Sequence, residues 1–210
     1  MPDFSERLLA SLREQVGKTM SEKRLTHTLG VEQTVCDMAA LYCPEKTGML
    51  CAAALLHDCT KEYDEAQTRE VLSREGIKLR TDEAQSPQIW HAITAPVEIL
   101  RLYPDLADPE LLQCVRWHTT GHEGISVPEA LLYLADVIEP GREYPACVAL
   151  RKRFFDADPA AMSTEKRAAH LCDVLRASLV GVRESLMAKG APVCADTLEA
   201  IAYLKSKTHL

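Results

Sequence analysis

Two polar residues, His57 and Asp58, follow directly on the apolar run Cys-Ala-Ala-Ala-Leu-Leu at 51–56. A run of this kind belongs in a protein core, so it carries the histidine and the aspartate inward with it. Removing an ionised carboxylate from water costs several kcal/mol or more unless a proton, an ion pair or a metal ion compensates the charge. The run therefore predicts a core that holds a cation beside Asp58, and we expect that cation to be a metal ion.

The same pattern recurs further along the chain. Histidine or aspartate stands among apolar or helical neighbours at four more positions: His27, His91, His118 and Asp136. With the first pair they make six candidate ligands of only two residue types. Their order, His, His-Asp, His, His, Asp, predicts one shared metal site.

Apolar residues recur at helical spacing, and no segment alternates apolar and polar residues as a half-buried strand does. Phe4, Leu8, Leu12 and Val16 would share one face of a first helix. Proline, glycine and capping residues bound the further helical segments, which we expect at 21–41, 44–57, 64–72, 87–104, 109–118, 126–140, 142–182 and 196–205. The sequence therefore predicts an all-α fold.

The length and composition are those of one globular domain. The chain has 210 residues, of which 47% are hydrophobic and 26% charged, so residues 1–210 can bury one substantial core. The candidate ligands confine the site to about 20–145, and helices over about 142–210 would complete the bundle.

Charge and hydropathy narrow the classes of partner. No apolar run approaches the roughly 20 residues that span a bilayer, and the N-terminus has no basic segment leading into an apolar stretch. We therefore expect a cytoplasmic protein without a membrane partner. The formal net charge of -7 argues against a nucleic-acid surface. Metal ions and a few Lys or Arg residues would have to neutralise a polyanionic substrate locally.

The chain has eight cysteines and no Cys-x-x-Cys pair. Several, including Cys36, Cys51, Cys114 and Cys172, occupy apolar positions where a free thiol serves as a small hydrophobic group. The sequence therefore predicts reduced core cysteines rather than a disulfide framework.

Adjacent residues on a helix point about 100° apart, so His57 and Asp58 are expected to serve two neighbouring ions, with Asp58 as the bridge. We expect the remaining ligands to divide between the two ions, His27 and Asp136 joining His57 on one, and His91 with His118 on the other.

Nitrogen and oxygen ligands without thiolate suit two divalent or trivalent ions of iron, manganese, zinc or cobalt, and the spacing does not choose among these metals. Two such ions about 3.5 to 4 Å apart would polarise phosphoryl oxygens and supply hydroxide near neutral pH. The expected chemistry is hydrolysis of a phosphoester or phosphoanhydride.

Other polar residues near the candidate ligands could contact a phosphorylated substrate. Lys61 follows Asp58 by three positions, and Arg142 follows a Pro-Gly turn, so an ammonium and a forked guanidinium are available. Thr119 and Gly121 come just after a candidate ligand and would offer a hydroxyl and an exposed amide.

Purely structural interpretations remain open for several of these residues. Asp58 could cap the following turn or pair with Lys61, and Asp136 could pair with Arg142 across its turn.

The rings of Trp90 and Trp117 are expected to pack in the core beside the site, where one of them could stack on an adenine.

Four local strings go beyond the His-Asp pattern. They are Lys-Arg-Leu-Thr-His at 23–27 with Gly30 and Val31, Leu-Leu-His-Asp-Cys-Thr-Lys at 55–61, His-Thr-Thr-Gly at 118–121, and Ala-Asp-Val-Ile-Glu-Pro-Gly-Arg at 135–142. In these strings, and over roughly residues 20–190, the chain resembles the YqeK family of HD-domain phosphohydrolases. The resemblance implies an all-helical HD-domain bundle, a di-iron centre, and symmetrical hydrolysis of diadenosine tetraphosphate to two ADP.

The resemblance also assigns roles to residues. The six positions that match metal ligands are His27, His57, Asp58, His91, His118 and Asp136. Asp58 and Lys61 would be catalytic, and Lys61, Arg142 and Arg24 would contact the nucleoside polyphosphate, together with Thr119 and Gly121. Since ADP is a good leaving group, positioning and charge neutralisation would carry the reaction.

Two rival functions stay open. One is another activity of HD proteins, such as a nucleotidase acting on monophosphates or a cyclic-nucleotide phosphodiesterase. The other is a non-catalytic helical module that binds a nucleotide, whose mark would be a lost ligand or lysine; none is missing here. The residues beyond about 190 match no motif, and the sequence leaves a homodimer open.

Overall fold

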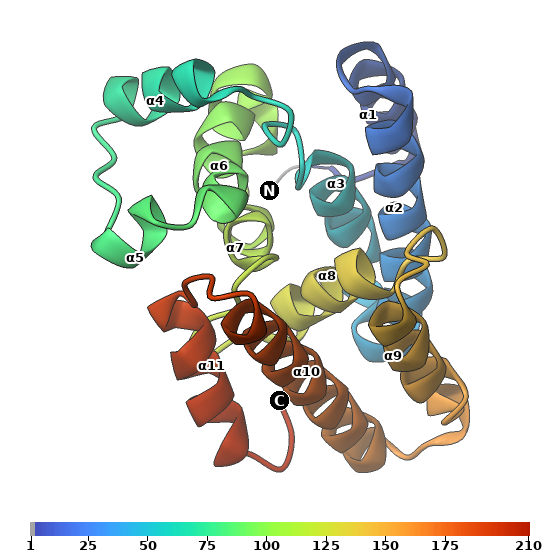
Figure 1. The fold of residues 1–210 in the computed structure, drawn as a ribbon. Coiled ribbons are helices and arrows are strands. Elements are labelled where there is room, and N and C mark those ends of the chain that lie inside the picture. Colours follow the sequence, from blue (N-terminus) through green and yellow to red (C-terminus); the bar gives the residue numbers. More distant parts are fainter. Residues whose placement is uncertain (1–2) are drawn as a thin grey trace.

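The computed structural model describes residues 3–210, and every regular element within that range is helical, with no strand (Figure 1). The eleven α-helices of this range are α1 (Glu6–Thr19), α2 (Glu22–Tyr42), α3 (Thr47–Leu56), α4 (Glu65–Arg74), α5 (Thr81–Ala84), α6 (Trp90–Leu102), α7 (Pro109–Trp117), α8 (Val127–Ile138), α9 (Pro145–Phe155), α10 (Thr164–Ala188) and α11 (Ala195–Lys205). Four short 3-10 turns also begin at prolines: η1 (Pro44–Lys46), η2 (Pro87–Ile89), η3 (Pro104–Leu106) and η4 (Pro159–Ala161). The predicted all-α fold is confirmed.

Two helices, α3 and α8, form the centre of the bundle. Met49 to Leu56 in α3 and Ala130 to Ala135 in α8 are all buried, so neither helix has a polar face along these stretches. A helix that is apolar on every side is stable only in the interior. Both helices pack against α2 and α7, which fixes their C-terminal ends in the middle of the molecule.

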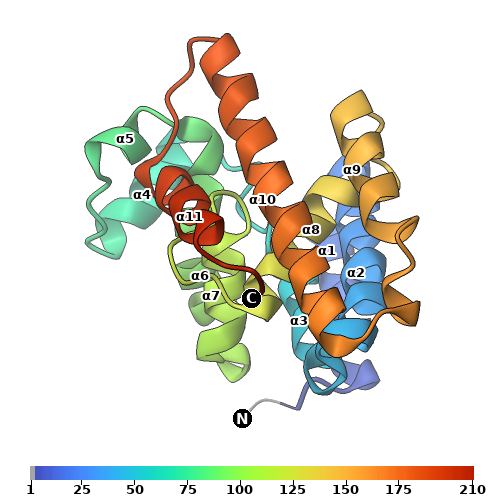
Figure 2. The same cartoon turned by 90° about the horizontal axis from the view of Figure 1, so that it is seen from below.

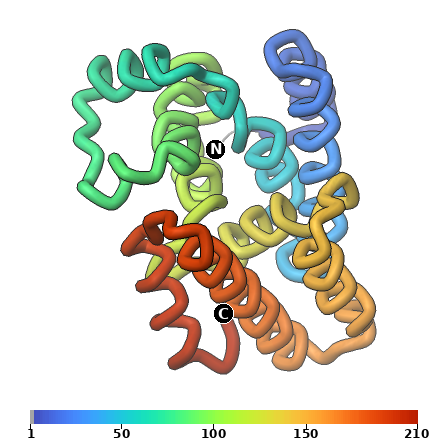
Figure 3. Tube along the Cα trace, in the orientation of Figure 1, coloured from blue at the N-terminus to red at the C-terminus, as the bar shows by residue number. Residues whose placement is uncertain are grey.

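The other helices surround this centre. The chain runs from α1 and α2 on one side to α4 and α5 on the other, and returns through α8 to the C-terminal helices (Figure 3). α6 packs between α7 and α4, while α9 and α10 cover α8. α11 packs on one side of α10 and α9 on the other, so α10 lies between them (Figure 2).

The C-terminal part differs in one respect from the helices expected over 142–182. The chain leaves the helix after Phe155 and re-enters it at Thr164. Between these points Asp158 adopts the left-handed conformation with φ 53°, and Pro159 follows it. Neither feature can continue a helix, so the segment turns a corner here.

The prediction that all core cysteines are reduced is wrong for one pair. Cys36 in α2 and Cys51 in α3 form a disulfide, with their Cα atoms 6.0 Å apart. The two helices pack side by side, and this brings together thiols that are 15 positions apart in sequence. The other six cysteines are free.

The segment beyond residue 190, which matches no sequence motif, holds the turn after α7 in position. In α11, the Thr197 hydroxyl donates to the Thr120 carbonyl at 3.0 Å. Asp196 pairs with Arg80 at 2.6 Å, and the Ala195 amide donates to Asp82 at 2.9 Å. None of the helices in residues 3–210 combines the length and the apolar character that crossing a bilayer requires.

The central position of α8 predicts a large penalty for opening a cavity in it. Leu132 is 0% exposed, so we expect Leu132→Ala to lower the free energy of unfolding by about 2–5 kcal/mol, measured by urea denaturation. Leu198→Ala in α11, where the side chain is 46% exposed, serves as control and should change it by less than about 0.5 kcal/mol. Equal effects of the two substitutions would contradict a core centred on α8.

Candidate metal centre

Five segments bring the six candidate ligands together at the C-terminal ends of the central helices. His27 projects from α2, His91 is the second residue of α6, and Asp136 lies in the last turn of α8. The other three stand just past helix ends: His57 and Asp58 follow α3, and His118 follows α7. All six side chains are buried or nearly so.

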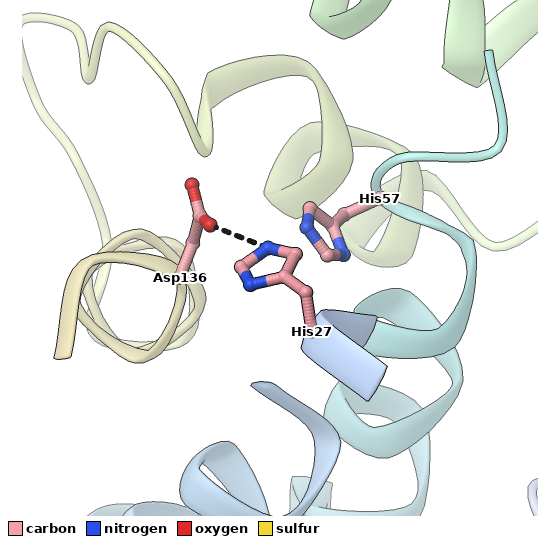
Figure 4. A group of neighbouring side chains, drawn as sticks. All are labelled: His27, His57 and Asp136. Carbon is pink, nitrogen blue, oxygen red and sulfur yellow. Dashed lines mark ion pairs between the residues drawn. The ribbon is translucent and has the colours of Figure 1, made fainter. Parts of the chain in front are cut away.

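The first group consists of His27, His57 and Asp136, and each offers a ligand atom within 4.8 Å of those of the other two. The side chains point toward one another from α2, α8 and the turn after α3 (Figure 4). Nε2 of His27 lies 3.0 Å from Oδ1 of Asp136. These are three of the four atoms that a tetrahedral metal site requires.

The second group consists of His57, Asp58 and His118, again within 4.8 Å of one another. Nε2 of His57 lies 3.4 Å from Oδ2 of Asp58, although adjacent residues on a helix point about 100° apart. α3 ends at Leu56, and the pair stands in the turn that follows, where His57 still has helical backbone angles of φ -55° and ψ -37°.

His91 joins this second group through two contacts. Its Nε2 lies 3.3 Å from Oδ1 of Asp58 and 3.1 Å from Nε2 of His118. Oδ2 of the same Asp58 faces His27 at 3.8 Å. The Asp58 carboxylate therefore stands between the two groups, with one oxygen toward each.

Backbone carbonyls fix the orientation of two of the imidazoles. The Nδ1–H of His57 donates to the Ala54 carbonyl at 2.6 Å, and that of His118 donates to the Val115 carbonyl at 2.6 Å. Each ring therefore directs the lone pair of Nε2 into the cluster, as a metal ligand must. Nε2 of His57 is buried and has no hydrogen-bond partner, which is a costly state without a cation.

Glu139 belongs to the candidate site, and reasoning from the sequence missed it. Its carboxylate accepts from Nδ1–H of His27 at 3.1 Å and is 3% exposed as a residue. A Cβ on Gly30 would lie 2.6 Å from Glu139 Oε2, so Gly30 leaves room for this carboxylate. Glu139 lies within the Asp-Val-Ile-Glu-Pro-Gly string, but its partner is 112 positions away in sequence.

With that proton on Nδ1, Nε2 of His27 presents a lone pair to the Asp136 carboxylate, 3.0 Å away, and Nε2 makes no hydrogen bond. Two acceptors at this distance need a cation between them. A second proton on His27 could supply it, and so could a metal ion.

The pKa shifts of Asp58 and His118 favour the protonation states in which these side chains can bind a metal ion. Burial would raise the pKa of Asp58, but the imidazoles of His57, His91 and His118 outweigh it and hold that pKa well below its ordinary value. Burial lowers the pKa of His118 to about 4, and His57 adds to the shift. Ionised carboxylates and neutral imidazoles are the forms that bind metals.

His27 is the exception. Burial would lower its pKa, but the carboxylates of Asp136 and Glu139 outweigh it and raise the pKa above the ordinary 6.5. A metal ion in the first group would therefore displace a proton from this ring.

Cationic side chains surround the cluster. Arg24 pairs with Asp58, and Arg142 pairs with Asp136 at 2.6 Å, so the Arg142 pairing expected as a structural alternative is present. Nζ of Lys61 lies 3.1 Å from Nδ1 of His91 instead of pairing with Asp58. Burial lowers the pKa of Lys61, against the opposing effect of Asp58.

The two residues expected to offer a hydroxyl and an amide to the substrate differ in position. Oγ1 of Thr119 lies 3.4 Å from Nε2 of His91, at the cluster. Gly121 is buried, packs toward Ala200 and Leu179, and donates its amide to the Trp117 carbonyl at 2.9 Å. The structure does not bring Gly121 together with the other site residues.

Two pockets open beside the cluster. The larger, of about 850 Å³, is lined by Arg24, His27 and Arg142 among others. The smaller, of about 220 Å³, is lined by Lys61 and His91, and Trp90 forms part of its wall.

The HD domain family model matches residues 24–141. A symmetrical bis(5'-nucleosyl)-tetraphosphatase of Bacillus subtilis is 28% identical over 202 residues, which cover 96% of this chain and 97% of the relative. A protein of the same name from Halalkalibacterium halodurans is 32% identical over 184 residues, covering 85% of this chain and 87% of the relative. A solved structure from Clostridium acetobutylicum, titled a predicted HD superfamily hydrolase involved in NAD metabolism, is similar with a TM-score of 0.80 and 28% identity, covering 94% of this chain and 96% of that one.

Metal content tests the cluster directly. We expect the metal content of His57→Ala and of Asp58→Ala to be lower than that of the unaltered protein by about tenfold or more, because the first change removes a ligand from both groups and the second removes one from the second group. Elemental analysis of the purified proteins measures this. His209→Ala, which removes an exposed histidine, is the matched control and should retain full metal content. Equal metal content in Asp58→Ala and His209→Ala would reject the site.

The close approach of Gly30 to Glu139 predicts an indirect loss of affinity. We expect Gly30→Ala to weaken metal binding by about 10–100-fold, because the added Cβ displaces the carboxylate that orients His27. Gly181→Ala is the control: that glycine also lies inside a helix, and a Cβ there meets nothing within 4 Å. It should leave metal affinity unchanged and raise stability by roughly 0.5–1 kcal/mol. Similar metal affinities in the two variants, measured by calorimetry, would show that Glu139 has no role.

Proposed function

Because this chain belongs to the HD domain family, we propose that it is a metal-dependent hydrolase that cleaves dinucleoside tetraphosphates symmetrically. With diadenosine tetraphosphate and one water, the products are two molecules of ADP. The names of two relatives that align over most of their length support this substrate class. A cytoplasmic setting belongs to the same proposal.

One observation carries the proposal: buried carboxylates and unpaired imidazole nitrogens converge at a centre flanked by cationic side chains. Nε2 of His27 and Nε2 of His57 are both buried without a hydrogen bond, and both face carboxylate oxygens. A second proton could compensate Nε2 of His27, but Nε2 of His57 would stay without a partner in a cluster that holds no metal ion. The donor set of imidazoles and carboxylates, without a thiolate, suits a first-row transition metal.

The proposal includes two metal ions, with iron as the first candidate and manganese, cobalt and zinc as alternatives. When bound, such ions supply Lewis acidity to phosphoryl oxygens and lower the pKa of a water molecule. We assign His27, His57 and Asp136 to one ion and His91 with His118 to the other, and Asp58, which has an oxygen toward each group, to both.

Three side chains of the protein would meet the charge of the polyphosphate. Arg24 and Arg142 line the larger pocket, where their guanidinium groups can form forked contacts with phosphate oxygens. Lys61 stands at the opposite side, beside His91, and lines the smaller pocket. A phosphate chain lying across the cluster would then be neutralised from both sides, which favours attack at its middle.

Product identification tests the proposal. The metal-loaded protein is incubated with diadenosine tetraphosphate, and we expect ADP as the sole nucleotide product. ATP together with AMP would mean asymmetrical cleavage and reject the proposal. Release of phosphate from monophosphates, or opening of a cyclic nucleotide, without ADP from the tetraphosphate would favour the other activities of HD proteins. Binding without hydrolysis would favour a nucleotide-binding module.

The position of Lys61 predicts a loss of rate without loss of metal. We expect Lys61→Ala to lower kcat for ADP formation by about 10²–10³-fold, because one donor to the reacting phosphates is removed. Metal content should match that of the unaltered protein. Lys18→Ala, which removes an exposed lysine from α1, is the control and should keep full activity. A full rate in Lys61→Ala would remove this residue from the mechanism.

A further inference from the structure

The two pockets reach different histidines of the cluster. The larger one reaches His27, and the smaller one reaches His91. These two histidines approach different oxygens of the same carboxylate, since Oδ2 of Asp58 is 3.8 Å from His27 and Oδ1 is 3.3 Å from His91. The shortest connection between the two histidines therefore runs past the Asp58 carboxylate.

The larger pocket has the chemistry of a whole-nucleotide site. Its volume of about 850 Å³ falls within the roughly 300–1,000 Å³ of pockets that enclose small ligands. Its wall holds three cationic side chains, Lys23, Arg24 and Arg142, together with the carboxylates of Glu22, Glu139 and Glu143. At its rim the ring of Tyr144 is 72% exposed, so packing in the core does not account for this aromatic side chain. An exposed ring beside cationic groups suits a base attached to phosphates.

The smaller pocket has less volume and more aromatic side chains in its wall. Its volume of about 220 Å³ lies below the usual range for enclosing a ligand of drug size, so it suits a flat base rather than a complete nucleotide. Tyr63 and Trp90 contribute rings to its wall; Trp90 is 9% exposed and packs in a small hydrophobic cluster, with Arg69 over its ring, so only its outer part can meet a ligand. The indole Nε1–H of Trp90 donates to the Glu83 carbonyl at 2.8 Å, and the Tyr63 hydroxyl donates to Glu98 at 3.3 Å. Both rings are therefore held in place before any ligand arrives, which lowers the cost of binding.

We propose that the smaller pocket is a second nucleoside subsite. A dinucleoside polyphosphate then lies across the metal centre, with one nucleoside at Tyr144 and the base of the other against Trp90 and Tyr63. This inference rests on the proposed function and adds a basis for specificity. A substrate with two nucleosides fills both pockets, whereas a mononucleotide fills only one and gains less binding energy.

A steric block at the smaller pocket tests the inference. Glu65 stands at the mouth of this pocket on α4 and is exposed, whereas Glu70 is exposed on the same helix outside the pocket. For Glu65→Trp, we expect KM for diadenosine tetraphosphate to rise about tenfold, which corresponds to roughly 1.4 kcal/mol. The inhibition constant of adenosine 5'-tetraphosphate, which has one nucleoside, should stay unchanged. Glu70→Trp should change neither constant.

The two-substrate comparison decides the outcome. An effect confined to the compound with two nucleosides supports the second subsite. Equal effects on both compounds, or none on either, overturn it. Formation of ADP by the unaltered protein separates this result from a failure of the proposed function, because the inference can fail while ADP is still produced.

A binding measurement gives an independent readout. The chain has two tryptophans, so Trp117→Phe leaves Trp90 as the only indole. In this variant, we expect adenosine, which has no phosphoanhydride to hydrolyse, to change the fluorescence of Trp90 saturably in the metal-loaded protein. Tripolyphosphate, which has no base, should leave the emission unchanged. The absence of a saturable change with adenosine would overturn the inference.

Discussion

The structure depends on how the negative charge of Asp58 is compensated in the interior. The apolar helix α3 delivers this carboxylate to the centre of the bundle, where it is 4% exposed. A lone ion at this depth would cost more than the fold can supply, so other segments bring compensating groups to it. Arg24 comes from α2, His91 from α6 and His118 from the end of α7. The site and the packing of the bundle are thus two results of one electrostatic requirement.

A chain with a net charge of -7 can still take a polyanion because its positive groups are concentrated where the substrate would lie. Arg24 and Arg142 line the larger pocket, and Lys61 lines the smaller one. Arg24 and Arg142 already pair with carboxylates of the cluster, so they are held at the site by the same charges that metal ions would neutralise. Metal binding would free these guanidinium groups for phosphate oxygens.

The sequence predicted much of this arrangement because apolar periodicity and buried charge are local signals. Neighbouring residues were enough to infer the helical class and the burial of the 51–56 run. They were also enough to infer that six His and Asp residues converge. Contacts between distant segments could not. Glu139 meets His27 only after α2 and α8 have packed, and the Cys36–Cys51 disulfide appears only when α2 lies against α3.

The hydrogen bond from α11 to the Thr120 carbonyl ties the loop beside His118 to the last helix of the chain. Every candidate ligand precedes residue 140, whereas this support begins at Ala195. During translation, the ribosome therefore releases all six ligands well before the helix that steadies one of them. In a nascent polypeptide, the loop beside His118 gains this hydrogen bond only after α11 has emerged and docked, so the support of the centre forms later than the ligands themselves.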